Sequence, residues 1–343
     1  MASAQPILFM ELGFFDAFVQ ETKKPFLNVA QRANLSFLYE LIFKRSSVYL
    51  DLDDQTICQV LHALHYGSDL PLGINQETAL NIQVLSSNNK LKSCQNTIEI
   101  VKDPTQWSLL SGQVLPTYLL VDQNEREAIR VANQTGIITI PRSFKFNRSI
   151  SSFAINTIEC VNNEGALQSV NLGNLMGPLP AAHSIIIEDP YLHTEGEEFL
   201  TEFLVKLHKP DLRKIPLHIL VMVQDQEAFE LKKGAKANRE VINRYHLNFS
   251  RLCHVAKLVY KKSNGVIHVE IVANAVQKMH DRNILSNAYW ISCGHSFKGK
   301  YDTNTEWTIR PIGLYFSQFT KRLEFIRKAL AINMYHSLNY LLN

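Results

Sequence analysis

The chain has 343 residues, of which 46% are apolar, 20% charged and 10% aromatic. This composition excludes intrinsic disorder, collagen-like repeats and coiled coil as the main architecture, and the length allows two domains or one large one. The five cysteines form no Cys-x-x-Cys pair and are odd in number, so neither a disulfide framework nor a zinc knuckle is expected.

The first residues, MASAQPILFMELGFF, have no basic start and reach an acidic residue early, which predicts no signal peptide. No apolar run approaches the roughly 18–20 residues that a membrane span needs. The longest run, 215–223, has the length of a strand. The sequence therefore predicts a cytoplasmic protein without a membrane span.

The net charge of +3 is unevenly distributed. Residues 1–200 carry 13 Lys and Arg against 21 Asp and Glu, which is −8, and residues 201–343 carry 22 against 11, which is +11. The basic half predicts a polyanionic partner, and ordinary lysine-rich solvated helix faces are the alternative interpretation.

The first half of the chain mixes helices and strands. Residues 25–45 repeat apolar side chains at helical spacing from Phe26 and Val29 onwards, and a second helix is expected to begin near residue 53. Short β-branched runs predict strands at 48–52, 82–85, 97–101, 118–121 and 137–140.

The second half reads as strands alternating with helices. A Ser-, Asn- and Gly-rich segment at 160–180 is the predicted linker, which gives a region 1–160 and a domain 181–343. Continuous apolar runs separated by helices predict an α/β sheet covered on both faces. We expect strands at 184–192, 217–223, 253–260 and 266–272, and helices at 197–208, 226–249 and 314–342.

The stretch from Gln277 to Lys300 carries the most informative polar side chains. His280 and Arg282 lie two positions apart on a segment expected to be extended, so both would point to one side of a sheet. One could act as nucleophile or proton donor while the other holds a phosphate oxygen. The neighbouring strand and turn bring back further polar residues and glycine, namely Asn287, Gly294, His295, Ser296 and Lys298.

This pattern resembles the phospholipase D superfamily, whose motif runs His-x-Lys, then four residues to an Asp, then six more to Gly-Ser. His280 and Arg282 take the His and Lys places, Asn287 falls where the Asp belongs, and Gly294 and Ser296 match the Gly-Ser turn with a one-residue delay. The resemblance covers roughly 180–300. The His-Asp-Arg form is similar to the C-terminal module of MIT-domain proteins and to bacterial proteins, several of them associated with defence.

The resemblance implies a phospholipase D-like mixed sheet flanked by helices, and a diverged two-repeat arrangement is one form that it allows. It also implies metal-independent and cofactor-independent phosphodiester chemistry through a phosphohistidine. His280 would be the nucleophile or acid, Arg282 and Ser296 the phosphate ligands, and Asn287 the orienting group, with His295 and Lys298 binding substrate. Arg in place of Lys keeps phosphate binding, but Asn in place of Asp cannot stabilise an imidazolium by charge.

Two main interpretations therefore stay open. One is a nuclease acting on DNA or RNA, in antiviral defence. The other is a catalytically inactive module that binds nucleic acid or assembles with a partner protein. Recognition of lipid head groups is a third interpretation, suggested by the MIT-associated relatives.

An active site of this family needs a second motif, and the chain has no other His-x-Lys or His-x-Arg. The best spacing match in the first half is LPTYLLVD, where Leu115 would replace His, Thr117 would replace Lys and Asp122 would remain. Either the first half is an inactive repeat, or two chains pair their His280 side chains in a homodimer.

Other candidates are weaker. His62 and His65, with Asp69 nearby, suggest packing on a helix more than a metal site, and no metal is expected. Glu188 and Asp189 end a strand and would line the same cleft as His280 or simply cap a turn. A basic cluster is expected to contact a phosphate backbone or form a solvated face, and consists of Lys232, Lys233, Lys236, Arg239 and Arg244.

Overall fold

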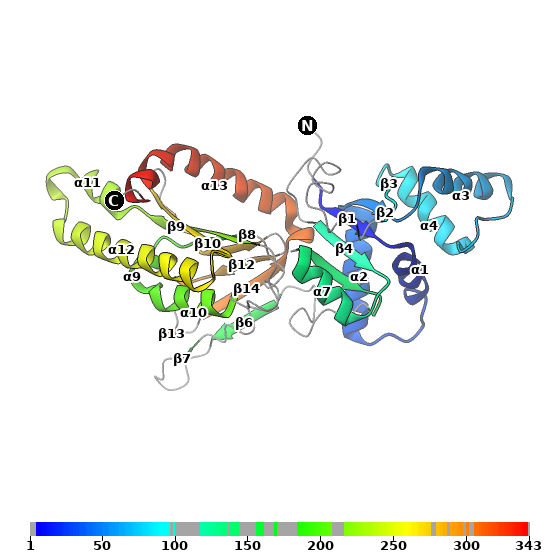
Figure 1. Cartoon of the computed structure of the whole chain (residues 1–343), viewed down its shortest axis with the longest axis horizontal. Helices are drawn as coiled ribbons and strands as arrows, with labels where there is room; N and C mark the ends of the chain where they lie inside the picture. Colours follow the sequence, from blue (N-terminus) through cyan, green and yellow to red (C-terminus); the bar gives the residue numbers. More distant parts are fainter. Residues whose placement is uncertain are drawn as a thin grey trace. The chain divides into compact units, whose positions relative to one another are not determined.

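The computed structural model describes residues 5–96, 99, 117–135, 137–143, 156–160, 168–169, 184–207, 216–275, 279–286, 289–297, 300–301 and 305–341. The chain forms two compact units, whose elements Figure 1 shows coloured along the sequence. Unit 1 comprises Met1–Ala154 with Pro311–Phe316, and unit 2 comprises Ile155–Arg310 with Ser317–Asn343.

Unit 1 is built on a parallel sheet with the strand order β3-β2-β1-β4-β5. Its central strand is fully apolar because both faces are covered, and Leu8, Phe9 and Met10 are completely buried. The strands are β1 (Ile7–Met10), β2 (Ser47–Leu50), β3 (Leu91–Ser93), β4 (Thr117–Val121) and β5 (Ile138–Pro141).

Several helices of unit 1 begin at side chains that accept hydrogen bonds from backbone N–H groups. Asp53 and Asn75 cap two of them, and Asn28 forms a reciprocal capping box with Gln31. The elements are α1 (Leu12–Glu21), α2 (Val29–Tyr39), the π-helix η1 (Glu40–Arg45), α3 (Asp54–Tyr66), α4 (Gln76–Ser87) and α7 (Glu125–Thr135).

Two expectations for this half need correction. The predicted strand at 82–85 is wrong, because Ile82 and Leu85 are buried on one face of α4. The predicted helix over 25–45 begins at Val29 and passes into η1, and Phe26 lies before it with 91% of its surface exposed. The strand expected at 97–101 falls outside the described residues apart from position 99.

Unit 2 is built on a mixed sheet with the order β10-β9-β8-β11-β12-β14-β6. The strands β8, β9 and β10 are parallel, whereas β11 runs antiparallel to both β8 and β12, and β6 runs antiparallel to β14. The strands are β6 (Asn156–Cys160), β8 (Ser184–Glu188), β9 (Leu217–Gln224), β10 (Ile267–Asn274), β11 (Asn283–Ser286), β12 (Tyr289–Cys293) and β14 (Thr305–Pro311).

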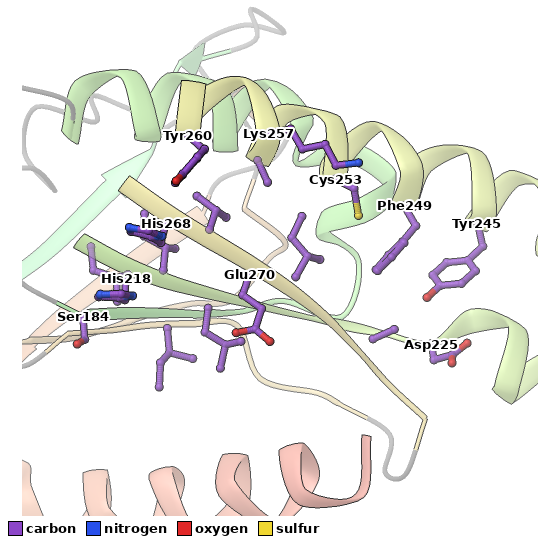
Figure 2. Close-up of a pocket in the computed structure, with 18 of the residues that line it drawn as sticks. Ser184, His218, Asp225, Tyr245, Phe249, Cys253, Lys257, Tyr260, His268 and Glu270 are labelled. Atoms are coloured by element: carbon purple, nitrogen blue, oxygen red, sulfur yellow. The ribbon is translucent and has the colours of Figure 1, made fainter. Parts of the chain in front are cut away.

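Helices flank this sheet, with α12 on one face of β8–β10 and α13 on the other (Figure 2). An aromatic cluster fills the core beside α10, where the Phe199 ring stacks on Phe203 and Phe297 and contacts Trp307. The helices are α9 (Leu192–Glu195), α10 (Glu197–Leu207), α11 (Gln226–Leu231), the 3-10 helix η3 (Gly234–Lys236), α12 (Arg239–Lys262) and α13 (Ile312–Leu341), which is kinked at Tyr315.

The helix expected at 226–249 differs from the structure. It is interrupted where Gly234 adopts a positive φ of 60°, and α12 then continues to Lys262. The strand predicted at 253–260 is therefore wrong. Its apolar residues Val255, Ala256 and Val259 continue the buried helical stripe that begins at Tyr245.

The region boundaries also differ in detail. Strand β6 pairs with β14, so residues 156–160 belong to the sheet of unit 2. The predicted linker at 160–180 lies mostly outside the described residues, although β7 (Gln168–Ser169) pairs with β13 (Lys300–Tyr301). Among the described strands the unit 1 sheet is parallel and the unit 2 sheet is mixed, and the two-repeat arrangement stays a prediction. Among the described helices, none has the length and apolarity to cross a bilayer.

Candidate functional site

The parallel strands β8, β9 and β10 end together at one edge of the unit 2 sheet, where Glu188 lies in register with Met222 of β9. The side chains that follow the strand ends are polar and buried, namely Glu188, Asp189, Gln224 and Asn274. Clefts at this edge of α/β sheets are the usual place for ligands.

Gln224 anchors the segment that leads to His280. Its buried amide donates to the Asn274 carbonyl at 2.7 Å and accepts from the Met279 N–H at 2.7 Å. Because both bonds are buried, the loop before His280 is fixed to the end of β9.

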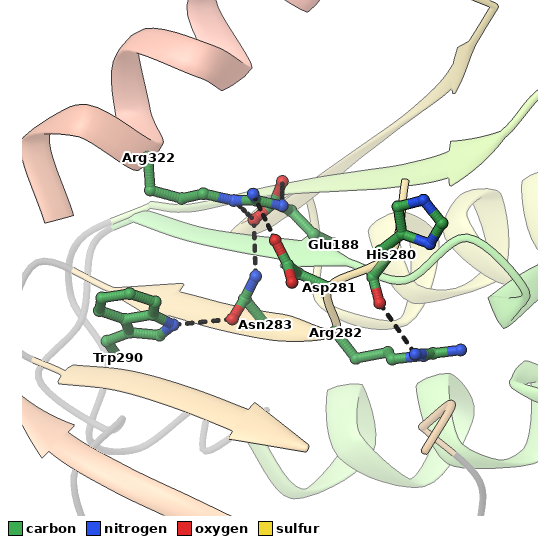
Figure 3. Close-up of polar contacts among 7 residues, drawn as sticks. All are labelled: Glu188, His280, Asp281, Arg282, Asn283, Trp290 and Arg322. Carbon is green, nitrogen blue, oxygen red and sulfur yellow. Dashed lines mark hydrogen bonds and ion pairs between the residues drawn. The ribbon is translucent and has the colours of Figure 1, made fainter. Parts of the chain in front are cut away.

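His280 and Arg282 lie in a loop before β11, and not on a strand as predicted. His280 is exposed, whereas Arg282 is half-buried, donates from Nη1 to the His280 carbonyl at 2.8 Å and lies 5.7 Å from the centre of the Tyr191 ring. Figure 3 shows the His280 ring and the Arg282 guanidinium extending to different sides of this loop. The expectation that they point to one side of a sheet is therefore wrong.

A buried carboxylate network supports this loop from α13 (Figure 3). Arg322 binds Glu188 through two hydrogen bonds, at 2.7 and 2.8 Å, and also donates to Asp281 at 2.7 Å. Asn283 donates to Glu188 at 3.1 Å and accepts from the Trp290 indole at 2.7 Å. Burial raises the pKa of Glu188, and the contacts with Arg322 oppose that rise.

Asp189 is the second buried carboxylate of the site, and it contacts the segments around Tyr191 and Phe297. Its carboxylate accepts from the backbone N–H of Tyr191 at 2.9 Å and of Phe297 at 2.6 Å, and it also bonds the Ser296 side chain. Burial raises the pKa of Asp189 to about 6, although these bonds and the charge of Arg282 act against it. Of the predicted residues, Ser296 therefore bonds this buried carboxylate, and the charge of Arg282 acts on it.

His193 lies on α9, just beyond Tyr191. It is buried edge-on against Tyr245 at 5.1 Å between ring centres, and its Nδ1 has no hydrogen-bond partner within the described part of the chain. Burial lowers the pKa of His193 to about 4, so the ring is neutral at physiological pH.

The remaining predicted site residues either make none of these contacts or lie outside the described residues. His295 is exposed on the turn after β12, beside Gly294. Asn287 and Lys298 lie outside the described residues, as does Leu115 of the suggested second motif. Asp122 of that motif lies in unit 1, paired with Arg142 at 3.0 Å.

The basic cluster begins at the same edge of the sheet. The ammonium of Lys232 donates to the Ala275 carbonyl at 3.2 Å and lies 4.5 Å from the centre of the Phe229 ring. Lys233 forms an ion pair with Glu230, and Arg244 pairs with Glu240 at 3.1 Å. Lys236 and Arg239 are exposed between them.

The geometry offers cationic and hydroxyl donors for an anion. The site contains three acidic residues. Glu188 and Asp281 bind Arg322, and Asp189 binds backbone N–H groups. These contacts of the carboxylates are with groups other than the His280 ring. Within the described ranges no group of three His, Cys, Asp or Glu side chains is arranged to hold a metal ion. The rings of His62 and His65 both pack on Tyr66.

Sequence reasoning missed Gln224, Tyr191, Asn283 and Arg322 as parts of this site. Tyr191 lies within the strand predicted at 184–192, so its position beside a strand end was a usable signal. Arg322 lies 134 residues from Glu188, and no local pattern marks it.

No protein-family model matches the chain, and no curated protein does. Among solved structures the chain is similar to TrmBL2, described as an archaeal chromatin protein that shows a novel mode of DNA binding, with 10% identity and a TM-score of 0.25. The match covers 50% of this chain and 53% of that one, so the chain spans about half the length of the protein it matches. A likeness of this strength does not bear on function.

Proposed function

We propose that unit 2 is a phospholipase D-like module that binds the phosphodiester backbone of nucleic acid at the carboxyl edge of β8–β10. One observation carries the proposal: the Arg282 guanidinium is positioned by the His280 carbonyl and by the Tyr191 ring. A guanidinium whose orientation is already fixed loses less entropy when it binds a phosphate oxygen.

The basic cluster supports nucleic acid over a single small phosphate. Lys232 is attached to the segment that leads from β10 into the His280 loop, and Lys236 and Arg239 extend exposed charge away from it. A row of cations beside a fixed arginine suits a polymer with repeated phosphates.

Binding without hydrolysis fits the carboxylate contacts better than catalysis does. A phosphohistidine route needs an imidazole that a carboxylate orients and whose positive charge it stabilises. Asp281, the acidic residue closest in sequence, is bound to Arg322 instead.

Hydrolysis by a homodimer is the second candidate, and the exposure of His280 favours it. A ring at the surface can meet the same ring of a second copy across a two-fold axis, which would supply the missing second histidine. In that case His280 attacks phosphorus in one chain and the partner protonates the leaving oxygen.

The binding proposal is tested by salt titration of the full chain with duplex DNA and with single-stranded RNA. Each phosphate contact on duplex DNA contributes a slope of about −0.9 in log affinity against log salt. Replacing Lys232, Lys236 and Arg239 by alanine should flatten that slope by about 2–3, and Arg282→Ala should weaken binding further. The control changes Arg327 and Lys328 to alanine, which removes the same kind of charge from exposed positions of α13. Equal slopes for all variants would refute the proposal.

The homodimer candidate is tested by incubating labelled DNA and RNA with the chain in excess EDTA. We expect binding without cleavage at all protein concentrations. Cleavage that rises with the square of protein concentration and disappears in His280→Ala would establish hydrolysis instead.

A further inference from the structure

A second feature of unit 2 is a cavity of about 1010 Å³ beside β10 and α12 (Figure 2). Strand β10 contributes both apolar and polar side chains to its wall, and α12 contributes apolar side chains that include Phe249 and Ala256. The lining residues of β10 are His268, Val269, Glu270, Ile271 and Ala273. None of the side chains of the phosphate site lines it. We call this cavity the β10 groove.

Strand β10 is the last strand of its sheet and pairs only with β9 in the described part of the chain. The Val266 carbonyl accepts from the Leu217 N–H at 2.8 Å, and the Asn274 carbonyl accepts from the Asp225 N–H at 3.0 Å. Because backbone groups alternate in direction along a strand, the even-numbered residues face β9. Val269, Ile271 and Ala273 therefore direct their N–H and C=O groups away from the sheet.

Val269, Ile271 and Ala273 are also only partly buried. The β10 groove thus combines a row of outward backbone donors and acceptors with apolar side chains from β10 and α12. An extended peptide needs both features, because its backbone pairs with a sheet edge while alternate side chains enter a pocket.

The ends of the groove carry opposite charges. Lys257 and Lys261 line it near the start of β10, and Asp225 and Glu227 line it near the end. Two large apolar residues also stay exposed along it, with Leu231 58% and Tyr260 48% accessible. Exposed apolar residues with charges of both signs at the rim are typical of a protein-binding surface.

We propose that the β10 groove binds an extended segment of a partner protein that adds a strand to β10. The segment has apolar residues at alternate positions, acidic residues beside Lys257 and Lys261, and basic residues beside Asp225 and Glu227. A second copy of this chain fits less well, because pairing two β10 strands would bring together two α12 helices. Each of these helices carries six Lys and Arg against one Glu.

The test uses a fluorescent ten-residue peptide with two aspartates, an alternating valine and threonine centre, and two lysines, together with its charge-reversed form. The control peptide has proline in place of every valine. We expect one of the two charge orders to bind the full chain about tenfold or more tighter than the proline peptide, which cannot pair with an edge.

Two variants locate the binding. Ile271→Pro removes an outward N–H without breaking the ladder to β9, and it should weaken binding about tenfold. Lys257→Glu with Lys261→Glu should weaken the preferred charge order and favour the reversed one. Lys262→Glu is the matched control, because this neighbouring lysine does not line the groove.

Three results would overturn the proposal. The first is equal binding of the valine and proline peptides. The second is unchanged binding by a folded Ile271→Pro chain. The third is a concentration-dependent dimer that Ile271→Pro dissociates, which would assign the edge to a second copy.

Discussion

In both sheets, Asp and Glu side chains lie at the carboxyl ends of the parallel strands. The environments of these side chains differ between the two units. In unit 1 the edge after β1, β2 and β4 carries Glu11, Asp51 and Asp122, none of which is fully buried. Burial and the charges of Asp51 and Asp122 raise the pKa of Glu11, whose carboxylate accepts from the Asp122 N–H. In unit 2, Glu188 and Asp189 are completely buried.

The difference shows that the burial of the carboxylates, more than their number, determines the charge at the surface of this part of a sheet. The buried unit 2 carboxylates are held by Arg322 and by backbone N–H groups. Arg282, His280 and Lys232 lie nearer the surface, together with Asp281, which pairs with Arg322. The unit 1 carboxylates remain partly solvated. This contrast supports our proposal that the unit 2 edge is the one that binds a phosphate.

The largest expected effect comes from removing the cation that holds Glu188. Arg322→Ala should destabilise unit 2 by about 3–5 kcal/mol, because a buried carboxylate loses its partner. Urea unfolding measures this loss. Changing Glu188 and Arg322 together to leucine should recover most of the lost stability, since no buried charge then lacks its partner. Arg327→Ala, on the same helix in an exposed pair with Glu324, should have no measurable effect. An equal loss for Arg322→Ala and Arg327→Ala would contradict this view of the edge.

The next effect is a pair of opposite pH dependences within unit 2. The pKa of Asp189 rises from 3.8 to about 6, so its contribution to stability is present below pH 4 and is lost as the pH rises through 6. The pKa of His193 falls from 6.5 to about 4, so its contribution is present above pH 6.5 and is lost as the pH falls through 4. Each displacement corresponds to about 3 kcal/mol, and the two offset each other between these limits.

Single variants should separate these contributions. As the pH falls from 6.5 to 4, the unfolding free energy of Asp189→Asn should decrease by about 3 kcal/mol relative to that of the native chain. The unfolding free energy of His193→Leu should increase by a similar amount over the same range. Urea unfolding at several pH values gives the comparison. Parallel stability curves for the two variants and the native chain would show that neither group is linked to folding.

Much of the fold could be predicted from local pattern. The run 217–223 is apolar at every position except His218, which indicates a strand covered on both faces, and β9 confirms the strand. The run CHVAKLVY contains similar residues but belongs to α12, because its apolar positions continue a stripe from Tyr245. Strand propensity was misleading there because the helical period is visible only over a longer window.

The candidate site was predictable only in part. The spacing of His280, Arg282 and Ser296 indicated one site, and the structure brings Arg282 and Ser296 to Asp189. The residues on either side of His280 are held by Gln224, which binds Met279, and by Arg322, which binds Asp281, and both partners are distant in sequence. Such partners follow from how α13 packs on the sheet, and no motif encodes that packing.

The smallest expected effect concerns the ion pair at the edge of unit 1. Arg142 binds Asp122 at 3.0 Å, but 59% of the Arg142 side chain and 33% of the Asp122 side chain stay accessible. Both charges are partly hydrated while they are paired. Arg142→Ala should therefore lower the unfolding free energy by less than about 1 kcal/mol. In 1 M salt, where the screening length is about 3 Å, the loss should vanish, whereas the loss from Arg322→Ala should persist because Glu188 is shielded from ions. Urea unfolding of both variants at low and high salt makes the comparison. A salt-resistant loss of several kcal/mol for Arg142→Ala would mean that the two edges are built alike, because an ion pair that resists salt must be shielded from solvent.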